Sequence, residues 1–372
     1  MRRALVALVL LPSVAFGWSF VGHRRLASMM HEGFPAGHCL RQWLQARQSP
    51  SLQDSACDPD RWRDTTHPNY DPNEFPRHFV HMDIVSPPSA WPRDLEVATQ
   101  QWGVSGVFAN GMVPWRVAEF YPQLVAAFER QDEATILRLT FWLSHYVTDA
   151  HMPLHAHSNF DPRGMHSRWE TDMFRDAVKA SAIEADARTY IGTAGRAYPR
   201  DAIFDVATRG MLLVDQIIAL DVAATDPDAG VACNSDFECL GQYCIEGACH
   251  AFDMDAFYGS IRELSARRWG DAVTVLASIL WSAWADAGAP ALVAFTGGCS
   301  MALPSGTPVL LGYPVTFTEP PAPDAGEGGG AGGGGEAPKP QPCGCSATPL
   351  GGVVALGLLA LLRRRQRVRD VG

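Results

Sequence analysis

Three histidines and two carboxylates in the middle of the chain have the spacing of metal ligands. His145 and Asp149 are four residues apart, and His166 and Glu170 repeat this interval. Because residues four apart leave the same face of an α-helix, each pair could bind one ion. The connection between the pairs carries a third histidine, His155, directly after Pro-Leu. Imidazole nitrogen and carboxylate oxygen together suit zinc, and a hydrolytic zinc site keeps one coordination position for water.

The order of these residues is similar to the pattern of a known group of enzymes. The chain has H-x3-D starting at His145, Pro-Leu-His ending at His155, and H-x3-E starting at His166. This pattern resembles the superfamily that joins zinc-dependent bacterial phospholipases C to the fungal single-strand-specific nucleases. The resemblance implies an all-α domain around a cluster of three zinc ions. It also implies hydrolysis of phosphoester bonds by a zinc-activated hydroxide.

The same resemblance places one zinc at the mature amino terminus. Arg2 and Arg3 precede a short apolar run, which predicts a signal peptide over residues 1–17. Cleavage there would make Trp18 the first residue, and His23 follows five positions later. In the superfamily, the amine and carbonyl of such a tryptophan bind a zinc together with such a histidine.

Two further segments match parts of the family that carry ligands. In ACDPDRWRD the resemblance points to Asp60 as a ligand and to Arg63 as its companion three residues later. The register stays open by two residues, because Asp58 and Arg61 have the same spacing.

The segment PRHFVHMD supplies the remaining histidine of the pattern. By resemblance this is His78, with His81 as the alternative. Phe79 follows directly, at the place where the nucleases stack a base, so it is a candidate substrate-binding residue.

The resemblance divides the ligands among three zinc ions, with Asp149 shared between the first and the third. Asp60 would also act as a general base, and Arg63 would stabilise charge on the phosphoryl oxygens. The expected ligands are Asp60, His78, His145 and Asp149 for the first zinc, His155, His166 and Glu170 for the second, and Trp18 and His23 for the third.

The motifs point to two different substrate classes. A glutamate at position 170 and the short interval from His155 to His166 resemble the phospholipases, whereas the W-x4-H terminus and Phe79 resemble the nucleases. We favour a phospholipid substrate over single-stranded nucleic acid. A third hypothesis is a surface binding protein in which zinc is structural and the cysteine-rich insertion contacts a partner. The hydrolase hypotheses imply no obligate protein partner.

The two ends of the chain predict export and surface attachment. Residues 313–342 are rich in proline and glycine and predict a flexible linker after a domain over 18–312. Residues 343–372 combine cysteines, a short apolar segment and arginines, and resemble the sorting signals of myxobacterial surface proteins. The resemblance implies cleavage near Cys345 and a location at the cell surface; the alternative is a plain membrane anchor.

The charge of the chain argues against general nucleic-acid binding. The formal net charge is −10. Removing Arg2 and Arg3 makes it −12, and removing the five arginines and Asp370 of the tail makes it −16. Such a surface lacks the basic footprint of a nucleic-acid binder, although a cluster of divalent cations would reverse the sign locally.

Nine cysteines in an exported protein predict disulfides. Cys39 and Cys57 form the candidate pair in the first half, and Cys299 has no evident partner. Four cysteines between Cys233 and Cys249 predict a small insertion over 226–252 with two disulfides, and zinc binding by these thiols is the less favoured alternative because no C-x2-C pair is present.

Helical periodicity dominates the rest of the chain, so we expect an all-α, single multi-helix domain. The region from Ser49 to Pro92 is rich in proline, aspartate and serine and predicts long loops. The expected helices cover 20–34, 39–47, a run from Pro114 through the central motif to about Ala182, 201–224, and 253–287 as one long helix or two.

Overall fold

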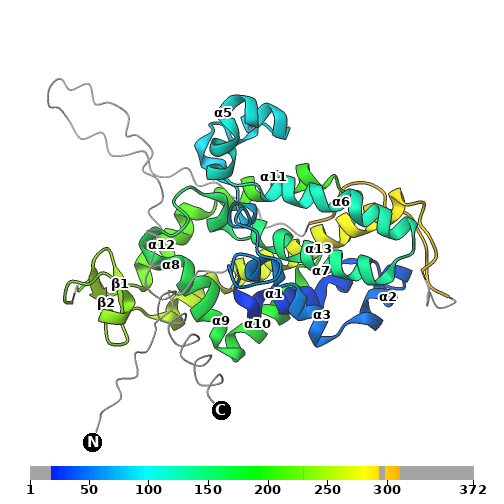
Figure 1. Cartoon of the computed structure of the whole chain (residues 1–372). Coiled ribbons are helices and arrows are strands. Elements are labelled where there is room, and N and C mark those ends of the chain that lie inside the picture. The colour runs from blue at the N-terminus through cyan, green and yellow to red at the C-terminus, as the bar shows by residue number, and fades with distance from the viewer. Residues whose placement is uncertain (1–17, 229, 293–297, 311–372) are drawn as a thin grey trace, which may run out of the picture. The chain divides into compact units, whose positions relative to one another are not determined.

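Helices make up most of the protein, as the sequence predicts, and the part of the chain that the structure describes contains one small sheet (Figure 1). The structure is a computed structural model that describes residues 18–228, 230–292 and 298–310. The signal peptide expected at 1–17, the linker at 313–342 and the tail at 343–372 lie outside these residues. Among the described residues, no helix combines the length and apolar character needed to cross a membrane.

The longer helices carry the fold. They are α1 (Ser19–Met29), α2 (Cys39–Arg47), α5 (Leu95–Asn110), α6 (Val113–Glu129), α7 (Glu133–Ala150), α10 (Ala177–Thr189), α11 (Pro199–Met211), α12 (Val214–Ala224) and α13 (Met254–Asp286).

Short elements connect them. These are α3 (Pro50–Ser55), α4 (Asp58–Arg61), α8 (Met165–Ser167) and α9 (Met173–Arg175), the 3-10 turns η1 (Met30–Gly33), η2 (Phe75–His78), η3 (Met82–Ile84), η4 (Pro88–Ala90), η5 (Pro153–Ala156), η6 (Pro162–Gly164) and η8 (Asp236–Glu238), the π-helix η7 (Arg168–Asp172), and the antiparallel strands β1 (Tyr243–Ile245) and β2 (Ala248–His250).

The long helix α13 is the central element of the bundle. It packs against α6, α7, α10 and α12, and its second half is buried almost throughout. Its buried hydroxyls form a ladder along one face. Thr274, Ser278 and Ser282 accept hydrogen bonds from the backbone N–H groups of Gly192, Gly195 and Ala197 at 2.8, 3.2 and 2.9 Å. Polar residues in this helix therefore satisfy the backbone of an irregular segment that the bundle buries.

The expected helix over 201–224 is two helices, α11 and α12, so that prediction is wrong in detail. Gly210, a poor helix former, precedes the break, and the buried guanidinium of Arg268 lies so close that a Cβ at this glycine would be 3.1 Å from it. Arg268 also donates to the carbonyl of Val206 at 3.3 Å. The segment 253–287 forms one helix. The helix α5 is additional to the expected set; Asp94 caps it by accepting hydrogen bonds from the N–H groups of Glu96 and Val97.

The predicted Cys39–Cys57 disulfide is wrong. Cys39 pairs with Cys299, and Cys57 is a buried free thiol. A backbone hydrogen bond from Cys39 to the carbonyl of Ser300, 2.9 Å long, brings the two segments together. Since 260 positions separate the bonded cysteines, no local pattern could indicate the pair.

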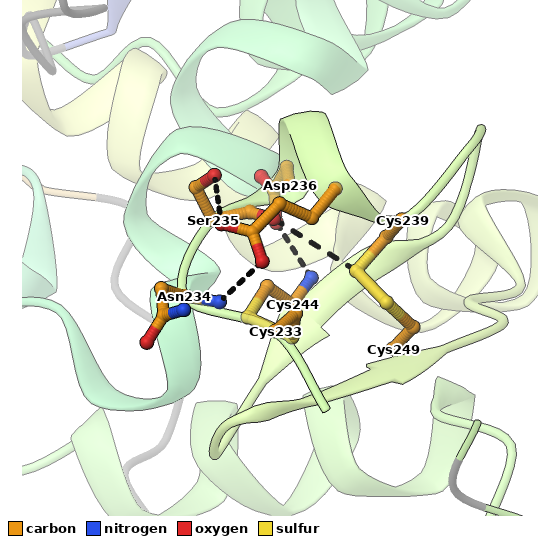
Figure 2. The surroundings of a disulfide bond; sticks show 8 residues. Cys233, Asn234, Ser235, Asp236, Cys239, Cys244 and Cys249 are labelled. Carbon is orange, nitrogen blue, oxygen red and sulfur yellow. Dashed lines mark hydrogen bonds between the residues drawn. A yellow bond between two sulfur atoms is a disulfide. The ribbon is translucent and has the colours of Figure 1, made fainter. Parts of the chain in front are cut away.

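The prediction of a small module with two disulfides is confirmed. Cys233 pairs with Cys244 and Cys239 with Cys249, and the side chain of Asp236 accepts a hydrogen bond from the backbone N–H of Cys244 at 2.6 Å (Figure 2). Because all four sulfurs are in disulfides, none is available as a thiolate ligand for zinc.

Burial raises the pKa of the Cys57 thiol to about 12. We therefore expect a thiol reagent to leave Cys57 unmodified in the native protein near pH 8 and to modify it once the protein is unfolded in guanidinium. Mass spectrometry of the labelled peptides, digested without reduction, should also show Cys39 linked to Cys299. Rapid native labelling at Cys57, or a Cys39–Cys57 peptide, would contradict this arrangement.

Candidate metal centre

Four side chains from three separate segments converge on one buried point. Nδ1 of His78 lies 2.8 Å from Oδ2 of Asp149 and 3.0 Å from Nε2 of His145, and that nitrogen is 3.2 Å from the same carboxylate oxygen. Oδ1 of Asp60 completes the group at 3.9 Å from His78 and 3.8 Å from His145. Ligand atoms about 2.0–2.2 Å from a tetrahedral ion lie about 3.3–3.6 Å apart, so the group has roughly the size of a metal site.

Helix α7 supplies half of this group. His145 and Asp149 lie one turn apart and are both fully buried. The Nδ1–H of His145 donates to the carbonyl of Ala56 at 2.8 Å. This bond leaves the lone pair of Nε2 directed at the group, which is the tautomer that a metal requires.

The first helix brings His23 to the other side of Asp149. Nδ1 of His23 lies 2.8 Å from the hydroxyl of Thr148, which itself donates to the carbonyl of His145. The hydroxyl therefore accepts from His23, and Nε2 of His23 faces Oδ1 of Asp149 at 3.4 Å. Oδ1 of Asp149 thus faces His23, whereas Oδ2 faces His78 and His145, so this carboxylate would be able to bridge two ions.

Trp18 lies next to this part of the centre. Its side chain is fully buried, and Nε1 donates to the carbonyl of Thr148 at 3.0 Å. The ring packs edge-on against Trp169 and Trp269 at centroid distances of 5.6 and 5.7 Å. Residue 18 is therefore fixed close to Asp149, where the sequence analysis expects the mature amino terminus.

A second group consists of His155, His166 and Glu170. The Nε2 atoms of the two histidines are 3.1 Å apart, and Oε1 of Glu170 lies 2.7 Å from His166 and 3.4 Å from His155. His166 is on α8 and Glu170 on the π-helix η7, so the expected helical pair is present with a widened turn between its members. Single π-turns of this kind are frequent at functional sites.

The disulfide module packs against the segment that carries this second group. Tyr243 donates to Asp172 at the end of η7 at 3.2 Å, and Arg163 donates to Glu246 at 2.8 Å. The guanidinium of Arg168 lies over the ring of Tyr243 at 5.3 Å. Strand β1 and the turn that follows it therefore contact the segment that carries the π-helix.

Two hydrogen bonds connect the first and second groups. Nδ1 of His155 donates to the carbonyl of His78 at 3.0 Å, and the N–H of Val80 donates to the carbonyl of His155 at 2.9 Å. The first bond directs Nε2 of His155 toward His166 and Glu170. The pair holds the loop after η2 against η5, so the two groups occupy fixed positions relative to each other.

The start of α6 holds the same loop from the opposite side. Backbone N–H groups of Met112 and Val113 donate to the carbonyls of Pro76 and Phe79 at 2.7 and 3.1 Å. Between α5 and α6, Gly111 has φ +90°, and a Cβ there would be 2.2 Å from the carbonyl oxygen of Phe79. Glycine is required because no side chain fits at this approach.

Several buried polar atoms of these groups have no hydrogen-bond partner among the described residues. They include Oδ2 of Asp60, Oδ1 of Asp149, Nδ1 of His166 and both oxygens of Glu170. Leaving such atoms unsatisfied inside a protein costs about 1–3 kcal/mol each, and more when they are charged. A bound cation would satisfy the carboxylate oxygens, so the residues fit a metal ion.

Without a metal ion, the buried carboxylates and imidazoles shift one another's pKa values. Burial alone would raise the pKa of Asp149, but the imidazoles of His145, His78 and His23 more than offset it and hold the pKa well below its usual range. Burial alone would likewise lower the pKa of His155, yet the Glu170 and Asp149 carboxylates raise it to about 9. Without metal, the buried carboxylates therefore interact favourably with the imidazoles beside them.

The structure separates the alternatives that spacing left open. Asp60 is buried beside His145, whereas Asp58 accepts hydrogen bonds from Trp142 at 3.0 Å and Arg61 at 2.8 Å. The Nη1 of Arg63 donates to Asp60 at 3.3 Å, so this arginine lies at the edge of the first group.

The structure also places the two candidate histidines, His78 and His81, in different surroundings. His78 is in the group, whereas the ring of His81 stacks on the ring of Phe79 at a centroid distance of 4.7 Å and an interplanar angle of 19°. Phe79 is half-buried, and Phe75, which is 50% exposed, lies edge-on to it at 5.4 Å.

Sequence reasoning missed the groups that orient the ligands. Thr148 and the carbonyl of Ala56 set two histidine tautomers, and the buried Glu74 stands four residues before His78. The interval of four was a usable signal for Glu74, but the surrounding composition predicted a loop. The cluster of Cys233, Cys239 and Cys249 is also compact, but its sulfurs form disulfides.

No protein-family model matches this chain, and no curated protein sequence matches it. Membership of the zinc phosphodiesterase superfamily therefore stays a prediction that rests on the residues themselves.

Binding of zinc, the metal that the sequence predicts, to the second group should release protons at neutral pH. Because the pKa of His155 is about 9, this imidazole is protonated at pH 7 in the metal-free protein and must lose its proton to bind zinc. We expect zinc affinity to rise between pH 6 and 9, and calorimetry in two buffers of different ionisation enthalpy to count the protons released. The variant His155→Gln should release at least one proton fewer. Affinity that is independent of pH over this range would contradict the assignment.

Proposed function

We propose that this protein is a zinc-dependent hydrolase of phosphoester bonds, with a phospholipase C-like activity as the first candidate. The observation that carries the proposal is the pair of adjacent buried ligand groups that are tied together through His78 and His155. The first group has four candidate protein ligands, and one of them, Asp149, also faces His23. The second group has three. A site with three protein ligands keeps a coordination position for water or substrate, as catalytic zinc sites do.

Zinc in these groups would supply a Lewis acid and would lower the pKa of water from about 15.7 toward 7. The protein's own residues do the remaining work. Arg63 lies beside Asp60 with its side chain 13% exposed, so its guanidinium can reach both the first group and solvent. Its fixed charge there suits an anionic phosphoryl group.

The carboxylate of Asp60 is suited to hold a proton during hydrolysis. Burial raises the pKa of Asp60, although the neighbouring His145, His78 and Arg63 oppose the shift. Its Oδ2 accepts no hydrogen bond from the described residues. An acceptor at this position can take a proton from attacking water, which is the general-base role expected from the resemblance.

The surroundings of Phe79 support a lipid substrate. One face of its ring is covered by His81, and Gly111 approaches so closely that a Cβ there would be 2.5 Å from Cδ2 of the ring. A stacked base needs an open ring face, so these contacts support a packing role for Phe79. The acidic composition of the chain agrees, because a nuclease attracts a polyanion.

The second candidate is a single-strand-specific nuclease, and a different ring favours it. Phe75 is half exposed, and the guanidinium of Arg63 lies 5.2 Å from its centroid. An exposed aromatic ring beside an arginine could stack a base while the arginine holds the adjoining phosphate. The third hypothesis, a binding protein with structural zinc, is less well supported because the second group has only three ligands.

The substrate test uses the mature chain from Trp18 to Tyr313 with no residue added before Trp18. With zinc bound, we expect faster hydrolysis of dispersed phosphatidylcholine than of single-stranded DNA, with release of phosphocholine. Faster DNA cleavage would favour the nuclease candidate. Zinc-loaded protein that hydrolyses neither substrate would favour the binding protein.

Replacement of Arg63 should separate catalysis from metal binding. We expect Arg63→Ala to lower kcat by about 10²–10³-fold, the usual cost of removing one group that stabilises transition-state charge, while zinc content stays unchanged. The matched control is Arg61→Ala, which removes an arginine two residues away that pairs with Asp54 and Asp58. Equal rates for the two variants would reject the role of Arg63.

A further inference from the structure

A fully buried glutamate stands behind one ligand of the first group. Oε1 of Glu74 lies 3.5 Å from Nε2 of His78, the ring nitrogen that points away from Asp149. Apart from this contact, the nitrogen has no hydrogen-bond partner among the described residues. Glu74 is therefore the acceptor within reach on that side of the imidazole.

The carboxylate of Glu74 is held by the neighbouring Arg77 and by groups from two helices. Arg77 and Arg116 approach Oε2 at 2.8 and 3.4 Å, and the hydroxyl of the buried Tyr146 donates to Oε1. Arg116 is on α6 and Tyr146 on α7, directly after His145. Two guanidinium groups balance the negative charge, so the carboxylate keeps its charge and its position without the metal ligands.

We propose that Glu74 is a positioning residue for the first metal: it accepts a hydrogen bond from Nε2–H of His78 and so directs the Nδ1 lone pair at the ion. This inference rests on the proposed zinc centre. His145 and His155 donate their outward nitrogens to backbone carbonyls, whereas His78 faces a carboxylate. A carboxylate acceptor makes the imidazole a stronger ligand than a neutral carbonyl does.

The position of Glu74 behind His78 indicates that it acts on the first group alone. Glu74 contacts His78 on the side away from Asp60, His145 and Asp149. The other polar partners of its carboxylate among the described residues are Arg77, Arg116 and Tyr146. Loss of its charge should therefore weaken one zinc and leave the others. Because the carboxylate reaches the ion only through the imidazole, its effect should appear in metal affinity before it appears in chemistry.

The test is zinc titration of the mature chain against a fluorescent chelator, with Glu74→Gln compared with wild type. We expect one zinc equivalent to bind about 10–100-fold more weakly, the usual effect of losing such a partner, and the remaining equivalents to keep wild-type affinity. The matched control is Glu133→Gln. Glu133 likewise accepts hydrogen bonds from an arginine, Arg47 at 3.0 Å, and from an aromatic N–H, that of Trp43 at 3.3 Å. Its replacement should leave every zinc affinity unchanged.

Circular dichroism of the zinc-free forms shows whether Glu74→Gln still folds. If it does not, Tyr146→Phe replaces it, because this variant removes the hydroxyl that fixes Oε1 and keeps the charge; we expect a several-fold weaker first zinc. Folded variants that bind every zinc as tightly as wild type would overturn the inference. Since the titration needs no substrate, wild-type protein that binds zinc but hydrolyses nothing would reject the proposed hydrolase alone, whereas protein that binds no zinc would reject both.

Discussion

The carboxylate of Asp149 imposes the constraint on which the rest of the centre depends. It is fully buried and faces imidazoles from three segments, His23 on α1, His78 on η2 and His145 on α7. An ionised carboxylate inside a protein costs several kcal/mol unless charges and hydrogen bonds compensate it. The convergence of three elements on one carboxylate is therefore favourable only if positive charge is supplied there, by imidazolium ions in the metal-free protein or by a bound cation.

Hydrogen bonds from the surrounding fold orient the histidines near this carboxylate. Each of His23, His145 and His155 has one nitrogen engaged by a hydroxyl or a backbone carbonyl, so the other nitrogen faces the centre. Backbone pairing between Val80 and His155 joins the two ligand groups. The ligands are therefore oriented by the fold before any ion binds, which lowers the reorganisation that binding requires.

Local patterns in the sequence predicted the parts of the centre that depend on local geometry. His145 and Asp149 face one way because an α-helix repeats every 3.6 residues, and the resemblance added His23, Asp60 and His78 from distant segments. Spacing alone could not choose Asp60 over Asp58, because both precede an arginine by three. The choice depends on which side of the short helix α4 faces α7, and that is a tertiary property.

Other features depend on contacts between distant segments and so were not predictable. The Cys39–Cys299 disulfide joins residues 260 positions apart. The division of 201–224 into α11 and α12 occurs where Arg268 of α13 reaches Gly210. The helical class itself was predictable because apolar periodicity extends over long segments, and the structure bears it out for the described residues.

The most direct test of the account is diffraction from crystals of the mature, zinc-loaded chain at wavelengths on either side of the zinc absorption edge. We expect one anomalous peak beside Nδ1 of His78, Nε2 of His145 and Asp149, a second beside His155, His166 and Glu170, and a third beside His23. Crystals grown with zinc that show no anomalous density at these groups would contradict the claim that they form a metal centre.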